Sequence, residues 1–526
     1  MKKVQEYFDS RYLPRTVQDS FMDWIYENWD KFDIFCALIP VAGGKSLIAL
    51  ATEEWALNEH EMKSSLIVPT KQLQDQYAEV HPLIPLLKGK ACFNCRSGNI
   101  NCKYTKDFTG EFCPDCSYLA NLMMCKGSPI TICNQSSYLA HLMQRPLVVI
   151  DEAHNLLDFL TNLLSIKFYK IRDNYPDIDA KNKESAVKIL LKWIGEEMDR
   201  YGAELESIKN RIELNKGKPS KLQKEMDDLE DKIERCKKVI ARLHTKPEDM
   251  LIAEKEDDEL NHKKTKSLVI APIKLASAAK AYIWPNGVQK LLLMSATFNH
   301  IDAAQLGLSE ERIGYFKCPS IIPPQRRPFV YSPLWDMSYK NQDKSMPGMA
   351  QDIQLICDAH PNEKGVVHCT YNIAVKLQKY LKDSRFIFHT QIDKDIQYRA
   401  FRANKHNAVL IASGMDEGID LADDFGRFQI IAKVQYLGLG DPLVVAKKNE
   451  IYDWYVWEAI RSISQAYGRI CRNPDDEGIT YFLDSCLNRL WNRIDLWPEW
   501  IKDARYKIAP DDFRKLMQSK INKETK

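Results

Sequence analysis

The chain has 526 residues, of which 45% are hydrophobic and 28% are charged, as is typical of an ordinary soluble globular protein. At roughly 150 residues per domain, this length excludes a single core and predicts about three or four folding units. The formal net charge is only +2, so a nucleic-acid site would have to be a local basic lining rather than a field of the whole molecule.

The start of the chain, Met1-Lys2-Lys3, leads into no apolar signal region, and no run of about 18 apolar residues follows anywhere. We therefore expect a cytoplasmic protein without membrane contact. In a reducing compartment, its 14 cysteines favour free thiols or metal ligands over a disulfide framework.

The first chemical motif follows a predicted buried strand at residues 34–39. Gly43 and Gly44 lead into Lys45 and Ser46, which open a predicted helix, so that backbone N–H groups point at bound phosphate. In such a loop Lys45 would reach the β- and γ-phosphates, and Ser46 would ligate magnesium. Ile39 stands where a small residue usually opens the loop, so a chance turn is the alternative for this stretch alone.

Two more apolar strands end in polar residues. The run at 146–150 is typical of a buried parallel strand, and its C-terminal end delivers Asp151 and Glu152, where open α/β sheets place their chemistry. We expect Asp151 to hold magnesium and Glu152 to orient or deprotonate water, because adjacent carboxylates need a cation. The strand at 291–294 ends in Ser295-Ala296-Thr297, which in isolation is an ordinary strand-end turn.

The C-terminal half has an apolar strand at 409–413 and, further on, a polar segment at 464–472. On a helix, Gln465, Arg469 and Arg472 would lie on one face. Two guanidinium groups presented together suit the charge that develops on a transferring γ-phosphoryl group. The alternative is a solvated helix surface.

Six cysteines crowd residues 92–125. By spacing alone, Cys92 with Cys95 and Cys113 with Cys116 indicate a zinc site. A segment of roughly 35 residues without a hydrophobic core needs such a metal to stay folded.

The residues between the Asp151 and Ser295 motifs number about 140, more than a crossover connection requires. Apolar residues there alternate spacings of four and three, as in a heptad seam: Leu222, Met226, Leu229, Ile233, Cys236, Ile240 and Leu243. We predict an antiparallel helical hairpin with a turn at 215–220. A coiled coil that joins two copies of the chain is the alternative.

Eight motifs in this order resemble those of superfamily 2 DNA helicases of the XPD/DinG type, a DEAH-box family with an iron–sulfur cluster. The matching stretches are 14–18, 43–46, 67–76, 151–155, 295–297, 365–368, 418–420 and 465–472. The resemblance implies an α/β fold with two RecA-like parallel-sheet domains, which bind ATP and Mg²⁺ between them. It further implies 5′-to-3′ movement along single-stranded DNA and unwinding of duplex. Ile39 and Ala42 depart from the family's phosphate loop.

Motifs and resemblance together assign roles to particular residues. The expected catalytic residues are Lys45, Asp151, Glu152, Gln465, Arg469 and Arg472. The expected nucleotide-binding residues are Arg15, Gln18, Gly43, Gly44, Lys45, Ser46, Gly418 and Asp420, with Ser46 and Asp151 on magnesium. The resemblance implies a four-iron, four-sulfur cluster on Cys95, Cys102, Cys113 and Cys116, with Cys92 as the rival for Cys102 and zinc as the other metal.

The resemblance also implies a domain organisation. The first RecA-like domain comprises 1–88, 127–157 and 266–316; it is interrupted by a cysteine-rich iron–sulfur domain at 89–126 and a helical arch at 158–265; the second RecA-like domain is 317–526. The expected partners of the monomer are single-stranded and forked DNA, and an RNA–DNA hybrid. An ATP-driven translocase or remodeller, or an ATP-gated binding module, is the alternative function.

Overall fold

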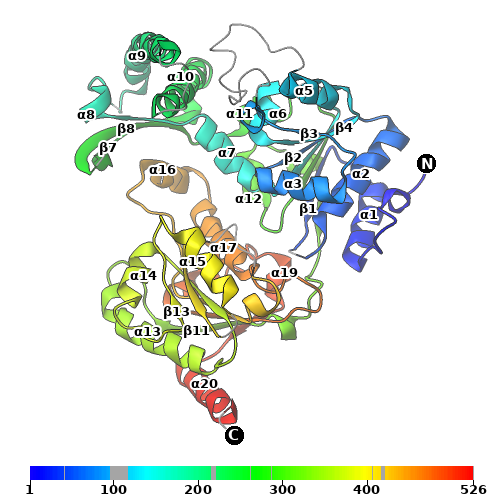
Figure 1. Cartoon of the computed structure of the whole chain (residues 1–526), viewed down its shortest axis with the longest axis vertical. Helices are drawn as coiled ribbons and strands as arrows, with labels where there is room; N and C mark the ends of the chain where they lie inside the picture. Colours follow the sequence, from blue (N-terminus) through cyan, green and yellow to red (C-terminus); the bar gives the residue numbers. More distant parts are fainter. Residues whose placement is uncertain are drawn as a thin grey trace.

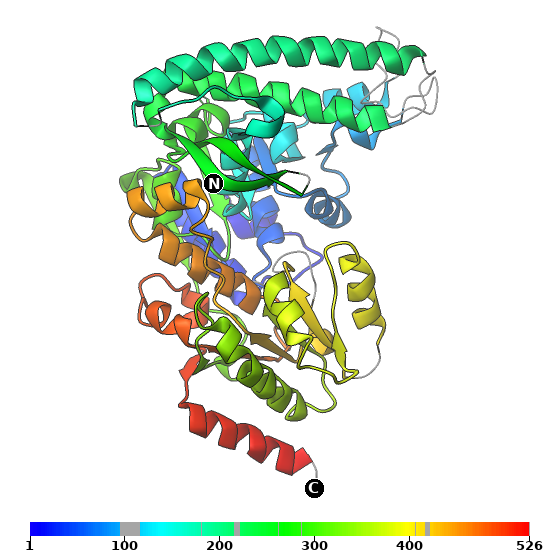
Figure 2. The same cartoon turned by 90° about the vertical axis from the view of Figure 1, so that its left-hand side faces the viewer.

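The computed structural model describes residues 1–40, 42–94, 116–141, 143–179, 181–214, 221–260, 262–285, 287–404, 407–415 and 421–524. These residues form two lobes, each built on a seven-stranded sheet, and a helical hairpin stands on the first lobe (Figures 1 and 2). The N-terminus lies on the first lobe and the C-terminus at the far end of the second (Figure 1). No described helix combines the length and the apolar character that crossing a membrane requires.

The sheet of the first lobe is parallel throughout. Its strands are β1 (Ile34–Leu38), β2 (Ser64–Val68), β3 (Leu86–Leu87), β4 (Ile130–Asn134), β5 (Leu147–Asp151), β9 (Lys290–Met294) and β10 (Ile313–Lys317). They lie in the order β10-β1-β9-β5-β2-β4-β3. All five residues of β5 are buried, as expected for a parallel strand that is covered on both faces.

Helices cover this sheet on both faces. They are α1 (Thr16–Asn28), α2 (Lys45–His60), α3 (Lys71–Val80), α5 (Ser117–Gly127), α6 (Gln135–His141), α7 (Asn155–Leu163), α11 (Ala276–Tyr282) and α12 (His300–Gln305), with the 3-10 turns η1 (Val4–Tyr7), η2 (Lys90–Cys92) and η4 (Glu310–Arg312). One core contains Trp29 stacked on Phe35 at 5.3 Å between ring centroids. A separate core contains Tyr138, Leu156 and Leu293.

The second lobe has the same kind of sheet. Its strands are β11 (Phe329–Trp335), β12 (Gly365–Cys369), β13 (Phe386–Ile387), β14 (Val409–Ser413), β15 (Phe428–Ile431), β16 (Ile479–Asp484) and β17 (Arg505–Lys507). They lie in the order β13-β14-β12-β15-β16-β11-β17, and every neighbouring pair is parallel. The predicted α/β fold with two parallel-sheet domains is confirmed.

Most helices of the second lobe lie around its sheet, but the one at residues 442–450 lies apart from it, toward the first lobe (Figure 1). They are α13 (Gln342–Asp358), α14 (Tyr371–Leu377), α15 (Lys394–Ala403), α16 (Pro442–Glu450), α17 (Trp454–Tyr467), α18 (Asn488–Trp491), α19 (Glu499–Lys502) and α20 (Pro510–Glu524), with η5 (Pro324–Arg326), η6 (Asp423–Phe425) and η7 (Ser485–Leu487).

The insertion between β5 and β9 contains the predicted helical hairpin. Its long helices α9 (Lys183–Leu214) and α10 (Lys221–Thr245) lie side by side (Figure 2). The heptad residues Met226, Cys236 and Leu243 are buried in one cluster with Tyr201 and Ile208 of α9. Because α9 already covers this seam, it is not available to a second copy of the chain.

The insertion also contains a small antiparallel sheet that the sequence analysis did not predict. Its strands are β6 (Ile166–Tyr169), β8 (Lys263–Pro272) and β7 (Met250–Leu260), in that order, beside α8 (Lys170–Asp173) and η3 (Pro247–Asp249). Strand β8 runs through the predicted domain boundary at residue 265. The arch therefore has a β-sheet base in addition to its helices.

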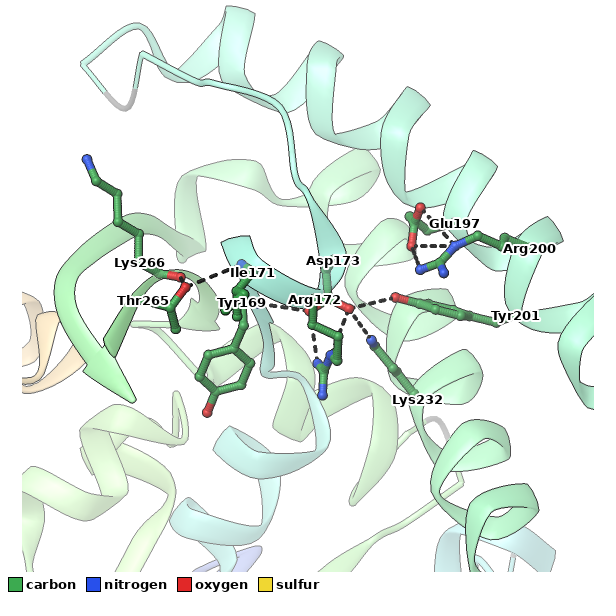
Figure 3. Close-up of polar contacts among 10 residues, drawn as sticks. All are labelled: Tyr169, Ile171, Arg172, Asp173, Glu197, Arg200, Tyr201, Lys232, Thr265 and Lys266. Atoms are coloured by element: carbon green, nitrogen blue, oxygen red, sulfur yellow. Dashed lines mark hydrogen bonds and ion pairs between the residues drawn. The ribbon is translucent and has the colours of Figure 1, made fainter. Parts of the chain in front are cut away.

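Figure 3 shows the polar cluster that joins the hairpin to this base. The Asp173 carboxylate accepts hydrogen bonds from Arg172 at 2.9 Å, Lys232 at 2.8 Å and the Tyr201 hydroxyl at 3.3 Å. It also accepts one from the backbone N–H of Tyr169 at 2.8 Å. Burial opposes the charge, but Arg172 and Lys232 hold the pKa of Asp173 below its usual range. One carboxylate therefore connects α8, α9, α10 and β6.

A buried carboxylic acid lies on α2, the helix after the glycine loop. The side chain of Glu53 is fully buried, and burial raises its pKa from an ordinary 4.5 to about 8, against weaker opposing effects of Ser64 and Arg145. The folded protein therefore holds a proton that the unfolded chain releases between these two pH values.

The first prediction concerns this proton. Because the pKa is raised in the folded state, Glu53 lowers the free energy of unfolding as the pH rises from 4.5 to about 8, by up to about 1.4 kcal/mol per pH unit. Glu53→Gln removes this slope, so the variant gains stability over the wild type toward high pH. Urea unfolding at several pH values checks this, with the exposed Glu27→Gln as the control. A wild-type pH slope that persists in Glu53→Gln would contradict the assignment.

Candidate functional site

Three neighbouring strands of the first sheet carry predicted site residues at their C-terminal ends. Strand β9 lies between β1 and β5. Lys45 begins the helix after β1, Asp151 is the last residue of β5, and Ser295 follows β9. The strand order therefore brings together motifs that are far apart in the sequence, at the edge where parallel sheets bind ligands.

The loop after β1 needs both of its glycines. A Cβ atom on Gly43 would lie 2.3 Å from Cγ2 of Ile39. Gly44 has a φ of +74°, and its Cβ atom would lie 2.3 Å from Nε2 of Gln18. Ile39 is fully buried beneath the loop, which explains how a large residue is accommodated there. The loop thus ends at the N-terminus of α2, where free N–H groups attract anions.

The departure at Ala42 has a conformational cost. Its φ is +68°, in the left-handed region that costs an L-residue about 1–2 kcal/mol. The guanidinium of Arg15 donates a hydrogen bond to the carbonyl of Ala42, and Gln18 donates to the carbonyl of Gly44 at 3.1 Å. The structure therefore places Arg15 and Gln18 against the glycine loop, where they hold its conformation.

A cluster of buried and partly buried charges lies at the ends of β1 and β5. The Lys45 ammonium is 2.9 Å from a carboxylate oxygen of Glu152. Burial, together with the neighbouring Glu152 carboxylate, raises the pKa of Asp151 to about 6. Burial also opposes the charge of Lys45, but the carboxylates of Glu152 and Asp151 raise its pKa above the ordinary value. Two carboxylates in one desolvated site therefore depend on a cation.

Tyr77 on α3 is a site residue that the sequence analysis missed. Its buried hydroxyl donates a hydrogen bond of 2.9 Å to Oδ2 of Asp151 and also interacts with Ser46. Burial raises the pKa of Tyr77 well above its usual range, so the hydroxyl remains a donor. An aromatic residue on an amphipathic helix predicts packing, and that pattern carries no signal for a contact with a distant carboxylate.

A hydrogen bond connects the end of β5 to the end of β9. Nδ1 of His154 and the Ser295 hydroxyl are 2.9 Å apart, and the backbone N–H of Thr297 donates to the same hydroxyl oxygen at 3.0 Å. Burial lowers the pKa of His154 to about 4, so the ring is neutral. His154 is also 3.4 Å from Glu152. The segment after β9 is thereby in contact with the carboxylate cluster.

A cleft of about 480 Å³ lies between the lobes. Its lining includes Glu152 and Thr297 from the first lobe and Gln465, Arg469 and Arg472 from the second. Burial opposes the charge of Glu152, but the positive charge of Lys45 holds the pKa of Glu152 below its usual range. The Arg469 guanidinium adds a smaller effect in the same direction. Four of the six predicted catalytic residues, from both lobes, thus line the cleft, and the other two, Lys45 and Asp151, lie next to Glu152.

The prediction that a single helical face presents Gln465, Arg469 and Arg472 is wrong. Helix α17 ends at Tyr467, and Gly468 caps it. Cys471 then takes a φ of +58°, which no helix allows. The two arginines consequently reach the cleft from the turn after the helix, although all three side chains line it.

Several predicted ligands lie outside the described residues: Gly418, Asp420, Cys95, Cys102 and Cys113. Cys116 is buried directly before α5, whereas Cys92 is exposed in η2. Within the described ranges, no group of three or more His, Cys, Asp or Glu side chains could hold a metal ion. The thiols of Cys125 and Cys133 are buried in an apolar core of the first lobe.

Both flanks of the cysteine-rich segment meet at Tyr118 on α5. The ring of Phe93 is 5.9 Å from the Tyr118 ring, and the Lys90 ammonium is 5.6 Å from it. The Tyr118 hydroxyl and His141 form a hydrogen bond of 2.9 Å. The chain thus leaves and re-enters the first lobe at one place.

Comparisons with known proteins agree with this geometry. A family model described as a helicase C-terminal domain matches residues 353–503. The regulator of telomere elongation helicase 1 homolog of Caenorhabditis elegans is 28% identical over 128 residues, which are 21% of this chain and 13% of that protein. The XPD helicase subunit of general transcription and DNA repair factor IIH of Dictyostelium discoideum is 33% identical over 95 residues, or 16% and 12% of the two chains. The match thus spans only about an eighth of these relatives' length.

Solved structures match over nearly the whole chain. An XPD helicase covers 95% of this chain and 100% of its own, with a TM-score of 0.56 and 18% identity. Xpd4 of S. tokodaii covers 94% and 100%, with a TM-score of 0.56 and 13% identity. The resemblance to XPD/DinG-type superfamily 2 helicases is confirmed. At these identities the structural matches establish the fold, so the two lobes are RecA-like in fold.

The second prediction concerns Tyr77 in the first RecA-like domain. Tyr77→Phe leaves a buried carboxylate oxygen of Asp151 without its donor, which should lower the free energy of unfolding by about 1.5–3 kcal/mol. Tyr138 is an equally buried tyrosine whose hydroxyl donates to a neutral carbonyl, that of Ile283, at 2.7 Å. Tyr138→Phe should therefore cost less, about 0.5–1.5 kcal/mol. Urea unfolding of both variants checks this, and equal losses would contradict a charge-assisted contact at Tyr77.

Proposed function

We propose that the chain is an ATP-dependent DNA helicase that moves 5′-to-3′ along single-stranded DNA and unwinds duplex. The observation that carries the proposal is the cleft in which Glu152 of one RecA-like domain, paired with Lys45, lies opposite Arg469 and Arg472 of the other. When a site is divided between two domains, binding or hydrolysis of its ligand changes the spacing of the domains. That link is what a motor on a strand requires.

The nucleotide would bind with its phosphates at the N-terminus of α2. The glycine loop leaves no room for side chains there, and Lys45 is placed for the β- and γ-phosphates. Mg²⁺, when bound, would neutralise phosphate charge. The donors fit this ion, because the carboxylate of Asp151 and the hydroxyl of Ser46 both interact with Tyr77 and are hard oxygen ligands.

Hydrolysis would depend on an exchange of partners at Lys45. In the structure Lys45 pairs with Glu152 at 2.9 Å, so the carboxylate is neutralised. When phosphate oxygens take over Lys45, Glu152 becomes the base that orients and deprotonates the attacking water. Arg469 and Arg472 would then stabilise the charge that develops on the transferring phosphoryl group. Gln465 would position that phosphoryl group.

The choice of DNA as substrate is supported by the XPD-type fold and by the placement of the insertions. The arch hairpin stands on the first domain, and helix α5, which follows the cysteine-rich segment, packs against β3 of the same domain (Figure 1). We propose single-stranded and forked DNA as substrates of a monomer, with an RNA–DNA hybrid as a further substrate.

The cysteine-rich segment would carry a four-iron, four-sulfur cluster on Cys95, Cys102, Cys113 and Cys116. Cys116 supports this role, since it is buried where the segment rejoins α5. Thiolates are the ligands that such clusters take. Zinc on Cys92, Cys95, Cys113 and Cys116 is the competing assignment.

The third prediction tests the motor. Glu152→Gln keeps the size of the side chain but cannot accept a proton, so strand-stimulated ATP hydrolysis should fall by about 10²–10⁴-fold while ATP binding persists. The exposed Glu79→Gln on α3 is the matched control and should retain the wild-type rate. A colorimetric phosphate assay with and without single-stranded DNA measures both.

The outcomes separate the candidate functions. A wild-type rate that DNA leaves unchanged would favour an ATP-gated binding module and contradict the motor. DNA-stimulated hydrolysis without opening of a forked duplex would favour a translocase or remodeller.

The fourth prediction concerns the metal. Protein purified without oxygen should be coloured and hold about four iron atoms per chain, and Cys116→Ser and Cys102→Ser should lose them. Cys92→Ser should keep the iron. Cys125→Ser is the control, because Cys125 is fully buried and burial raises its pKa to about 11. A colourless protein with one zinc, lost in Cys92→Ser, would overturn the assignment.

A further inference from the structure

A buried charged contact joins the two RecA-like domains outside the lining of the nucleotide cleft. Asp302 lies on α12, shortly after the Ser295-Ala296-Thr297 turn of the first domain. Its partners Trp457 and Arg461 lie on α17 of the second domain, the helix that carries Gln465 and leads into Arg469. None of the predicted site residues takes part in this contact.

The geometry of the contact is tight. Nη2 of Arg461 donates to Oδ1 of Asp302 at 2.8 Å, and the indole Nε1 of Trp457 is 3.0 Å from both carboxylate oxygens. The backbone N–H of Asn299 donates to Oδ2 at 3.1 Å. Asp302 is fully buried and Arg461 is 5% exposed. Arg461 also donates to Glu458 at 2.7 Å.

Apolar packing surrounds the charges. Ala296 and Ile301 of the first domain belong to one buried cluster with Trp457 and Ile460 of the second. The indole of Trp500, from α19, donates a hydrogen bond of 2.9 Å to the carbonyl of Ala296. Water is therefore excluded from the Asp302–Arg461 pair, and the turn after β9 is held at a second point by the second domain.

Burial makes this contact stiff. If the two charges separated in this dry environment, each would be left without a partner. The domains therefore cannot slide past each other here without a large loss of stability. Arg461 and Gln465 are four residues apart on α17 and therefore lie on the same side of the helix. A shift of α12 is consequently carried by α17 to Gln465 and to the turn with Arg469.

We propose that Asp302, Trp457 and Arg461 form an interdomain positioning junction. The junction sets the distance at which Gln465, Arg469 and Arg472 face Glu152, and it passes movement of the turn after β9 to that end of α17. These are positioning residues, since none of them lines the cleft. The effect of the junction on catalysis rests on the ATPase proposed above. Its role in fixing the geometry of the two domains does not.

The chain contains a matched control within one domain. Asp352 on α13 is buried, accepts a hydrogen bond of 2.7 Å from the indole of Trp335, and pairs with Arg514 at 2.9 Å. Arg514 lies over the Trp335 ring at 5.8 Å, as Arg461 lies over Trp457 at 5.4 Å. All three residues of this second trio belong to the second domain, so its loss affects stability without touching the domain interface.

The fifth prediction compares Asp302→Asn with Asp352→Asn, and the milder Trp457→Phe with Trp335→Phe. Asp302→Asn should lower kcat for DNA-stimulated ATP hydrolysis by at least about tenfold with less than about a threefold change in KM, because the arginines are displaced and the phosphate loop is intact. Trp457→Phe should lower kcat in the same direction by a smaller factor. The two control variants should keep kcat at the wild-type value.

A second measurement needs no turnover. In nucleotide-free protein, hydrogen–deuterium exchange of α12 and α17 should rise in Asp302→Asn and Trp457→Phe and stay unchanged in the controls. Equal exchange and equal kcat in the junction and control variants would overturn the proposal. If the wild type hydrolyses no ATP, the proposed function fails, and the exchange experiment alone then decides the junction. Should Asp302→Asn not fold, Trp457→Phe carries both measurements.

Discussion

The structure of the cleft depends on the ion pair between Lys45 and Glu152. Asp151 is buried and the adjacent Glu152 is partly buried, and an arrangement of this kind is unfavourable unless a cation lies beside it. Strand order supplies that cation, since β9 brings β1 and β5 within reach of each other. In the proposed ATPase, Lys45 would exchange this carboxylate for bound phosphate, and the rest of the fold positions groups around that exchange.

The local parts of this site could be predicted from the sequence because each combines an apolar strand with a polar end. Lys45, Asp151 and Ser295 were found in that way, and the structure brings all three strand ends together. The single helical face predicted for Gln465, Arg469 and Arg472 is wrong, because the prediction continued the helical spacing beyond the end of the helix. Gly468 was the available signal, since glycine commonly ends a helix. The β-sheet at the base of the arch was missed because its long, charged strands lack a clear alternating pattern.

Contacts between distant residues could not be predicted in this manner. Tyr77 reaches Asp151, and Asp302 reaches Arg461, across separations that no local pattern encodes. In each case the side chain type predicts an ordinary role: a tyrosine in a core, an aspartate in a helix cap. Asp302 does cap α12 through Asn299, and its carboxylate at the same time binds a second domain. Tertiary packing gives such residues an additional partner that their local sequence does not show.

Backbone strain gives independent support for the location of the site. Among non-glycine residues of the described chain with positive φ, Asn174, His262, Asp423 and Asp453 are types that tolerate this region, and Glu61 caps a helix. The remaining three are Ala42 in the phosphate loop, Glu152 beside its lysine, and Cys471 between the two arginines. Each costs about 1–3 kcal/mol, and none has a local compensation in its residue type. Strain of this kind persists only where the surrounding structure enforces it, and here Glu152 lines the cleft while Ala42 and Cys471 lie in the two segments that lead to Lys45 and Arg472. The geometry of the cleft is thus maintained against the preference of its own backbone, which is the property expected of a site that must hold a ligand rather than of a surface between two domains.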